Sequence, residues 1–230
     1  MGSIPDYSSM IDFIIEEHTG ISGNGSFQFR TAKSLKRFIA GIDESILVFM
    51  NEQHKKMFYD ALISQELSTT EKMMLIFWQM IYSNTLFHDI TAEVFMNAVY
   101  QGRSSLSQDD IYSYVRHLKE QNPNELKWSE ATLKIIGSKY LTTMKKLGLA
   151  EGSQRKTIRY PLISDALFVY FIRWCLCVFP TNCTISNPYI KFGFCDKMTL
   201  ISKLKKIEFI QYWDITQLND EVTIELKPYE

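Results

Sequence analysis

The stretch of sequence that decides the fold is residues 129–158, which read SEATLKIIGSKYLTTMKKLGLAEGSQRKTI. Ser129 is a typical N-cap residue, and the helix predicted after it has apolar residues at spacings of three and four, which give it one buried face. That face comprises Leu133, Ile136, Tyr140, Leu141, Met144 and Leu147. The corner Leu147-Gly148-Leu149 ends the helix, and residues 157–160 (TIRY) then predict a short basic strand that stops at Pro161.

A second helix is predicted directly before this stretch. Ser107 is its N-cap, Asp109 and Asp110 suit a first turn that favours negative charge, and residues 121–124 (QNPN) stop it. Helix, turn, longer helix and basic hairpin follow one another in the order typical of a winged helix-turn-helix, whose second helix lies in the major groove of DNA. Helix-plus-hairpin units also serve as protein-interaction modules, so both uses stay open.

The residues expected to contact DNA lie on the exposed side of the longer helix and on the hairpin, or wing. Hydroxyl and ammonium groups bond phosphate oxygens, and a wing reaches the phosphates nearby. The helix residues are Ser129, Thr132, Lys134, Ser138, Lys139, Thr142 and Lys145, and the wing residues are Arg155, Lys156 and Arg159. The group is rich in Lys and lacks the mixture of Arg and Asn that direct base reading employs, which predicts phosphate binding with little sequence preference.

The net charge of −1 over 230 residues conceals an uneven distribution. Residues 128–160 carry seven basic and two acidic side chains, residues 191–206 five basic and one acidic, and residues 30–37 four basic and none acidic. Segregated charge creates a local positive field on a nearly neutral protein, although any single run is also what a solvated helix face shows.

The whole chain is predicted to be mainly α, with a helical bundle followed by a winged helix-turn-helix-like half that carries short β-hairpins. Apolar periodicity indicates helices over residues 10–18, 32–50, 52–66, 69–83 and 91–100, with a break at Gly41 left open. The expected boundary separates a bundle of residues 1–103 from a DNA-binding domain of residues 104–230. That domain is expected to end in a helix over residues 198–207 and a hairpin around Asn219-Asp220.

No catalytic residue, metal site or cofactor is predicted. The cysteines Cys175 and Cys177 point to different faces of a helix, no Cys-x2-Cys pair exists, and none of the four His is spaced i, i+4 from another. The glycine-containing loop of residues 20–25 lacks the Lys-Ser/Thr pair that a phosphate-binding loop requires. We therefore expect a protein that is not an enzyme.

The chain is expected to be cytoplasmic, without a membrane segment. Four Cys in 230 residues are too few for a disulfide scaffold, and the first apolar stretch, residues 10–15, lacks the basic flank of a secretory signal. The longest apolar run, residues 166–180, contains Arg173 and is shorter than the ~20 residues of a membrane helix. It is predicted to be a buried helix.

Two segments of the chain resemble the BrxA family of the BREX (bacteriophage exclusion) phage-defence systems. They are residues 67–152, within them Leu126-Lys127-Trp128-Ser129-Glu130-Ala131-Thr132-Leu133 through Met144-Lys145-Lys146-Leu147-Gly148-Leu149, and the upstream region from Phe29-Arg30-Thr31-Ala32 to Ile42. The resemblance implies a small, mostly helical, cytoplasmic DNA-binding protein of a phage-defence operon, with no enzymatic activity of its own.

Two function classes follow. The first is a non-enzymatic protein that binds double-stranded DNA mainly through the phosphate backbone. The second is an assembly subunit that uses the same surface to hold other proteins of the defence system, without direct DNA binding. The salt dependence of DNA affinity separates them, because phosphate contacts weaken steeply with added salt and apolar contacts do not.

Overall fold

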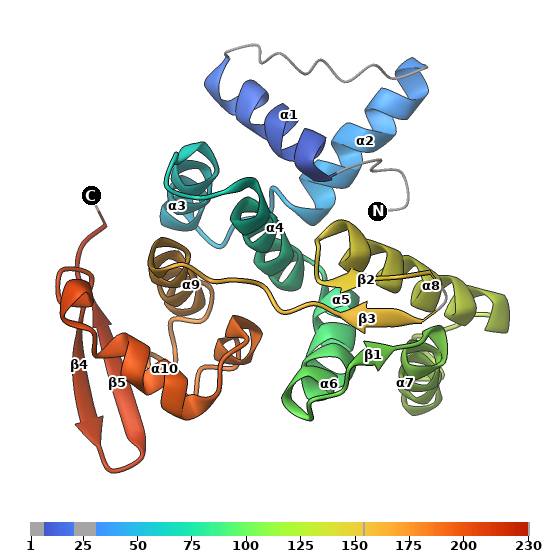
Figure 1. The fold of residues 1–230 in the computed structure, drawn as a ribbon. Helices are drawn as coiled ribbons and strands as arrows, with labels where there is room; N and C mark the ends of the chain where they lie inside the picture. The colour runs from blue at the N-terminus through green and yellow to red at the C-terminus, as the bar shows by residue number, and fades with distance from the viewer. Residues whose placement is uncertain (1–6, 21–30, 154, 230) are drawn as a thin grey trace. The chain divides into compact units, whose positions relative to one another are not determined.

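The computed structural model describes residues 7–20, 31–153 and 155–229, and within them the protein is mainly helical with two small antiparallel sheets (Figure 1). This confirms the predicted fold class. The chain forms two compact units: the first comprises residues 1–48 and 68–161, and the second residues 49–67 and 162–230. The boundary predicted between residues 103 and 104 lies inside the first unit.

The first unit contains a helical bundle centred on α4 (Thr69–Ser83). Its other helices are α1 (Tyr7–Thr19), α2 (Ala32–Ser45), α5 (Thr85–Ile90), the π-helical turn η1 (Thr91–Phe95) and α6 (Met96–Tyr100). Every residue from 74 to 81 is buried, and α1 and α2 both pack against α4. The N-terminus of α4 carries a capping box, in which Ser68 and Glu71 satisfy each other's backbone N–H groups.

The remainder of the first unit is a helix pair followed by a small sheet. Its elements are β1 (Ser105–Leu106), α7 (Gln108–Gln121), α8 (Glu130–Lys146), β2 (Ala150–Glu151) and β3 (Lys156–Ile158). The strand order is β1-β3-β2, both pairings are antiparallel, and the registers include Ser105 with Thr157 and Ala150 with Ile158. Strand β1 lies next to the boundary that was predicted between residues 103 and 104.

The second unit is built on two helices that lie side by side, α3 (Glu52–Ile63) and α9 (Asp165–Val178). The remaining elements are η2 (Ile190–Gly193), α10 (Lys197–Leu204), η3 (Ile207–Phe209), β4 (Trp213–Leu218) and β5 (Glu221–Leu226). Ten residues of α9 are buried, as predicted, and the hairpin turns at Asn219, which has a φ of 55°. In the part of the chain that the structure describes, no helix combines the length and apolar character needed to cross a membrane.

Replacing Gly41 by alanine is expected to stabilise the protein by about 0.5–1 kcal/mol, the usual gain when a helix-interior glycine becomes alanine. Helix α2 continues through Gly41 without the break left open above, and a Cβ atom there would meet nothing within 4 Å. Gly193→Ala is the matched control, because its Cβ would lie 2.5 Å from Phe171 Cε1 in the core. Urea denaturation should show opposite signs for the two variants; a destabilised Gly41→Ala variant would contradict the prediction.

Candidate functional site

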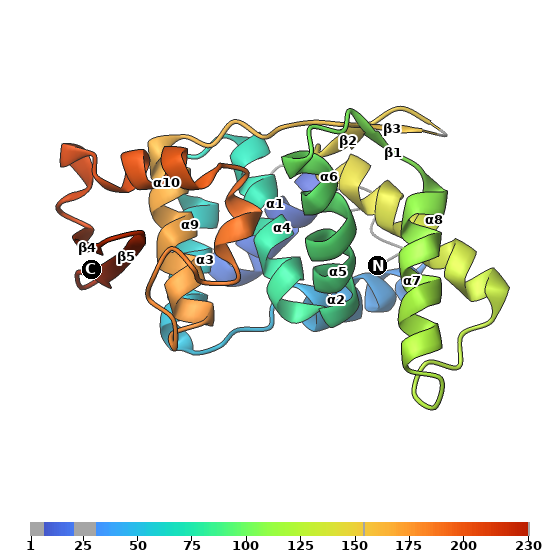
Figure 2. The same cartoon turned by 90° about the horizontal axis from the view of Figure 1, so that it is seen from below.

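Helices α7 and α8 pack tightly at Gly137, and Figure 2 shows them lying together in the first unit. A Cβ atom at Gly137 would lie 3.1 Å from Gln108 Cγ and 3.2 Å from the Gln108 carbonyl oxygen. The Gln108 side chain also donates a hydrogen bond of 2.9 Å to the Lys134 carbonyl. Because a larger residue at 137 would push the helices apart, glycine fixes the placement of α8 against α7.

The Leu147-Gly148-Leu149 corner redirects the chain from α8 into β2. Gly148 has a φ of 76°, the Gly148 N–H donates to the Lys145 carbonyl at 3.1 Å, and the Leu149 N–H donates to the Met144 carbonyl at 2.9 Å. This pair of bonds is a Schellman motif, which needs a left-handed residue and therefore favours glycine. Both leucines are buried, so the corner anchors the sheet to the core of the unit.

The exposed and buried sides of α8 follow the predicted register, with one difference. Leu133, Leu141 and Leu147 are buried, but Ile136 is only half-buried. Its neighbour Ile135 is 52% exposed, a feature that the sequence analysis missed. The polar residues on the exposed side, all solvent-accessible, are Lys134, Ser138, Lys139, Thr142 and Lys145.

The start of α8 uses Ser129 and Thr132 to complete the helix. The Thr132 N–H donates to Ser129 Oγ at 3.1 Å, and the two hydroxyl oxygens lie 2.9 Å apart. Next to this cap, Tyr112 donates a hydrogen bond to the Glu130 carboxylate, which lowers the pKa of Glu130 and keeps the carboxylate charged. Glu130 therefore marks an acidic edge of an otherwise basic helix surface.

Lys156 is buried in the hairpin, unlike the other basic residues of the wing. Its ammonium donates to the carbonyl oxygens of Gly152 at 2.7 Å and Ser153 at 2.6 Å. Along β3, residues 156 and 158 face inward and residue 157 faces outward, which is the alternation that any strand imposes. The structure thus gives Lys156 a role in holding the turn, which the sequence analysis did not foresee.

The two wing arginines are exposed and differ in their contacts. Arg159 forms an ion pair of 2.5 Å with Glu151 across the hairpin, where both side chains are about half exposed or more. Arg155 makes no ion pair with any of the residues described. An exposed pair such as Arg159–Glu151 adds little stability and can exchange partners easily. Arg155 and Arg159 are therefore the wing cations available to an external anion.

The other two basic clusters lie elsewhere. In the first unit, Lys33, Lys36 and Arg37 are exposed on α2, while Arg30 falls outside the described residues. The cluster of residues 191–206 belongs to the second unit, where Lys206 contacts Asp165 at 2.9 Å. Among the residues that the structure describes, only the α8 surface combines exposed lysines with a basic hairpin in one small substructure.

The cysteines and histidines do not converge on a metal site in the described residues, where no group of three or more His, Cys, Asp or Glu side chains could hold an ion. The four Cys are free thiols, and burial raises the pKa of Cys175 well above its usual range. A thiol held in its protonated form is a poor nucleophile and a poor ligand.

The sequence model of the BrxA family matches residues 20–173, from before α2 through most of α9. Because this match covers more than half of the chain, the chain belongs to the BrxA family, a family of the BREX phage-defence systems, as the sequence resemblance indicated. No curated protein and no solved structure matches the chain.

Proposed function

We propose that the protein is a non-enzymatic, double-stranded-DNA-binding component of a BREX system, acting in the cytoplasm through a winged helix-turn-helix. The observation that carries the proposal is the exposed face of α8, whose lysines continue onto the arginines of the β2–β3 hairpin. The element order α6-β1-α7-α8-β2-β3 with sheet order β1-β3-β2 supports the assignment, because it presents one helix and one wing on the same module.

In this proposal α8 lies in the major groove and the wing follows the adjacent backbone. Lys134, Lys139 and Lys145 neutralise phosphates beside the groove, and Ser138 and Thr142 add hydroxyl contacts. Arg155 and Arg159 contact phosphates from the wing. Arg159 does so after its ion pair with Glu151 breaks. Ser129 and Thr132 lie at the helix N-terminus, where a phosphate is favoured by the helix dipole, and Lys156 positions the wing.

A second candidate function is an assembly subunit that binds another protein of the defence system through the same surface. Ile135 favours it, because a half-exposed apolar side chain amid lysines suits the centre of a protein interface. Because phosphate contacts weaken with added salt and apolar contacts do not, the two candidates predict different salt dependences of binding at this surface.

The test is fluorescence anisotropy of unrelated duplexes over a series of salt concentrations. Five cation–phosphate contacts give a log–log slope of about −4.5, with similar affinity for every sequence. Arg155→Met should reduce the slope by about 1. Its neighbour Lys156→Met should leave the slope unchanged and lower the melting temperature, because it removes buried hydrogen bonds from a charged group, which contribute roughly 1.5–3 kcal/mol to stability. No salt-dependent binding by the parent would favour the assembly subunit.

A further inference from the structure

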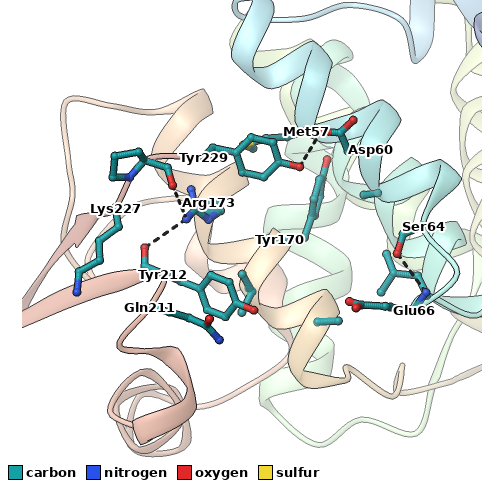
Figure 3. A pocket seen from close by; sticks show the side chains of 15 residues that line it. Met57, Asp60, Ser64, Glu66, Tyr170, Arg173, Gln211, Tyr212, Lys227 and Tyr229 are labelled. Atoms are coloured by element: carbon teal, nitrogen blue, oxygen red, sulfur yellow. Dashed lines mark hydrogen bonds between the residues drawn. The ribbon is translucent and has the colours of Figure 1, made fainter.

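The second unit contains a cavity of about 720 Å³, open to solvent on one side, between α3, α9 and the segments that flank the terminal hairpin (Figure 3). Its wall includes Asp60 and Glu66 on one side, and Tyr170, Arg173, Tyr212 and Tyr229 on the other. This volume falls within the range of pockets that hold small organic ligands.

Arg173 is a buried cation in this wall, and it has no counter-ion among the residues that the structure describes. The residue is 5% exposed, and among the described residues Nη2 donates to the carbonyl oxygens of Tyr212 and Pro228, both at 3.5 Å. Nη1 is buried and has no hydrogen-bond partner in the described chain, and no described carboxylate forms an ion pair with the guanidinium. A buried charge is costly unless it is paired, and the described part of the chain supplies no anion to this guanidinium.

Two other charged groups of the wall, Lys227 and Asp60, already have partners. Lys227 donates a hydrogen bond to the Ile210 carbonyl at 2.7 Å and forms an ion pair with Asp214 at 3.1 Å. Neither of these two partners lines the cavity. Asp60 accepts a hydrogen bond of 3.0 Å from the Tyr229 hydroxyl, which fixes that ring. Arg173 is thus the group in this wall that is suited to bind an oxyanion. The geometry of a guanidinium matches that of a carboxylate or a phosphate.

Aromatic rings surround the guanidinium. The Arg173 Cζ atom lies 5.3 Å from the Tyr229 ring centroid and 5.9 Å from that of Tyr212, and Figure 3 shows the guanidinium between these two rings. Tyr170 adds a third ring to the wall. Rings of this kind pack well against a planar ligand, while the polar groups around them set its orientation.

We propose that this cavity binds a small ring-bearing anion, whose phosphate or carboxylate pairs with Arg173 and whose planar ring packs against the tyrosines. The site shares no residue with the surface of α8 or with the proposed DNA contacts. It assigns a function to a unit whose last part, residues 174–230, lies outside the family match.

The test is isothermal titration calorimetry of the full chain with three probes: adenosine monophosphate, indole-3-acetate and adenosine. Binding of the first probe identifies a phosphate site and binding of the second a carboxylate site, whereas adenosine, which has a ring and no anion, should bind far more weakly. Arg173→Met should lower the affinity of the bound anion roughly 10- to 100-fold, the range for a charge-assisted hydrogen bond. Lys197→Met removes an exposed cation outside the cavity and should bind like the parent.

Val169→Trp provides a second variant, because it fills the cavity from α9 and leaves Arg173 in place. Val169→Trp should also reduce the affinity for the anion roughly tenfold or more. If Arg173→Met does not fold, this variant still tests the proposal. Three results would overturn the proposal: neither anion binds the parent, adenosine binds as tightly as the anions, or the folded variants bind the anion as the parent does.

Discussion

Replacing Lys134, Lys139 and Lys145 together by alanine is expected to weaken binding of duplex DNA by roughly 10²- to 10³-fold at about 0.1 M salt. The three lysines are exposed on one side of α8, so their removal creates no cavity and exposes no core residue. Each phosphate contact contributes about 0.9 to the slope of log affinity against log salt, so the slope should become shallower by about 3. Fluorescence anisotropy with unrelated duplexes measures both quantities.

The matched control for this variant is the triple alanine replacement of Lys197, Lys203 and Lys205. It makes the same change in net charge, but these residues lie on and just after α10 in the second unit. Its affinity should stay close to that of the parent. If both triple variants lose affinity equally, the effect comes from total charge; if the α8 variant binds as the parent does, α8 is not the DNA contact and the assembly subunit is preferred.

Trp213→Ala is expected to lower the free energy of unfolding of the second unit by about 3–5 kcal/mol, the usual range for a buried tryptophan. The Trp213 ring is buried against Phe209, with centroids 5.2 Å apart, and against Phe168 at 6.2 Å. Its indole N–H donates a buried hydrogen bond of 2.9 Å to the Leu204 carbonyl. Truncation therefore removes a hydrogen bond and leaves a cavity at the base of the β4–β5 hairpin.

Trp213→Phe separates these two contributions. It keeps most of the apolar volume and removes the donor to Leu204, so it should lower stability by about 1–3 kcal/mol, the penalty of a buried carbonyl left without its partner. Urea denaturation followed by far-ultraviolet circular dichroism compares both variants with the parent. Equal stability of Trp213→Ala and the parent would show that the ring is not part of the core.

Local signals made much of the first unit predictable. The N-caps Ser68, Ser107 and Ser129 all hold helix N-termini in the structure, and the corner after α8 has the backbone bonds that its glycine requires. These features depend on residues within a few positions of one another, so their physical cause is fully contained in a short window of sequence. The exposure of the α8 lysines follows from the same helical period.

Features that depend on distant residues were not predictable in this way. Strand β1 has only two residues, and it is defined by pairing with β3, some fifty positions later. The burial of Lys156 follows from the inward side of β3 and from the carbonyl groups that the turn brings to its ammonium. The cavity around Arg173 requires the packing of α3 on α9, which no local pattern encodes.

The discontinuity of the second unit has a consequence for synthesis on the ribosome. Helix α3 ends at Ile63 and its partner α9 begins at Asp165, so about 100 residues are added between them. At about 5–20 residues per second, the nascent α3 waits roughly 5–20 s before its partner emerges. During that interval Met57, Phe58 and Leu62, buried in the finished protein, have no α9 to cover them. Nascent chains released before α9 is made would therefore carry this apolar surface uncovered, as a target for chaperones or aggregation.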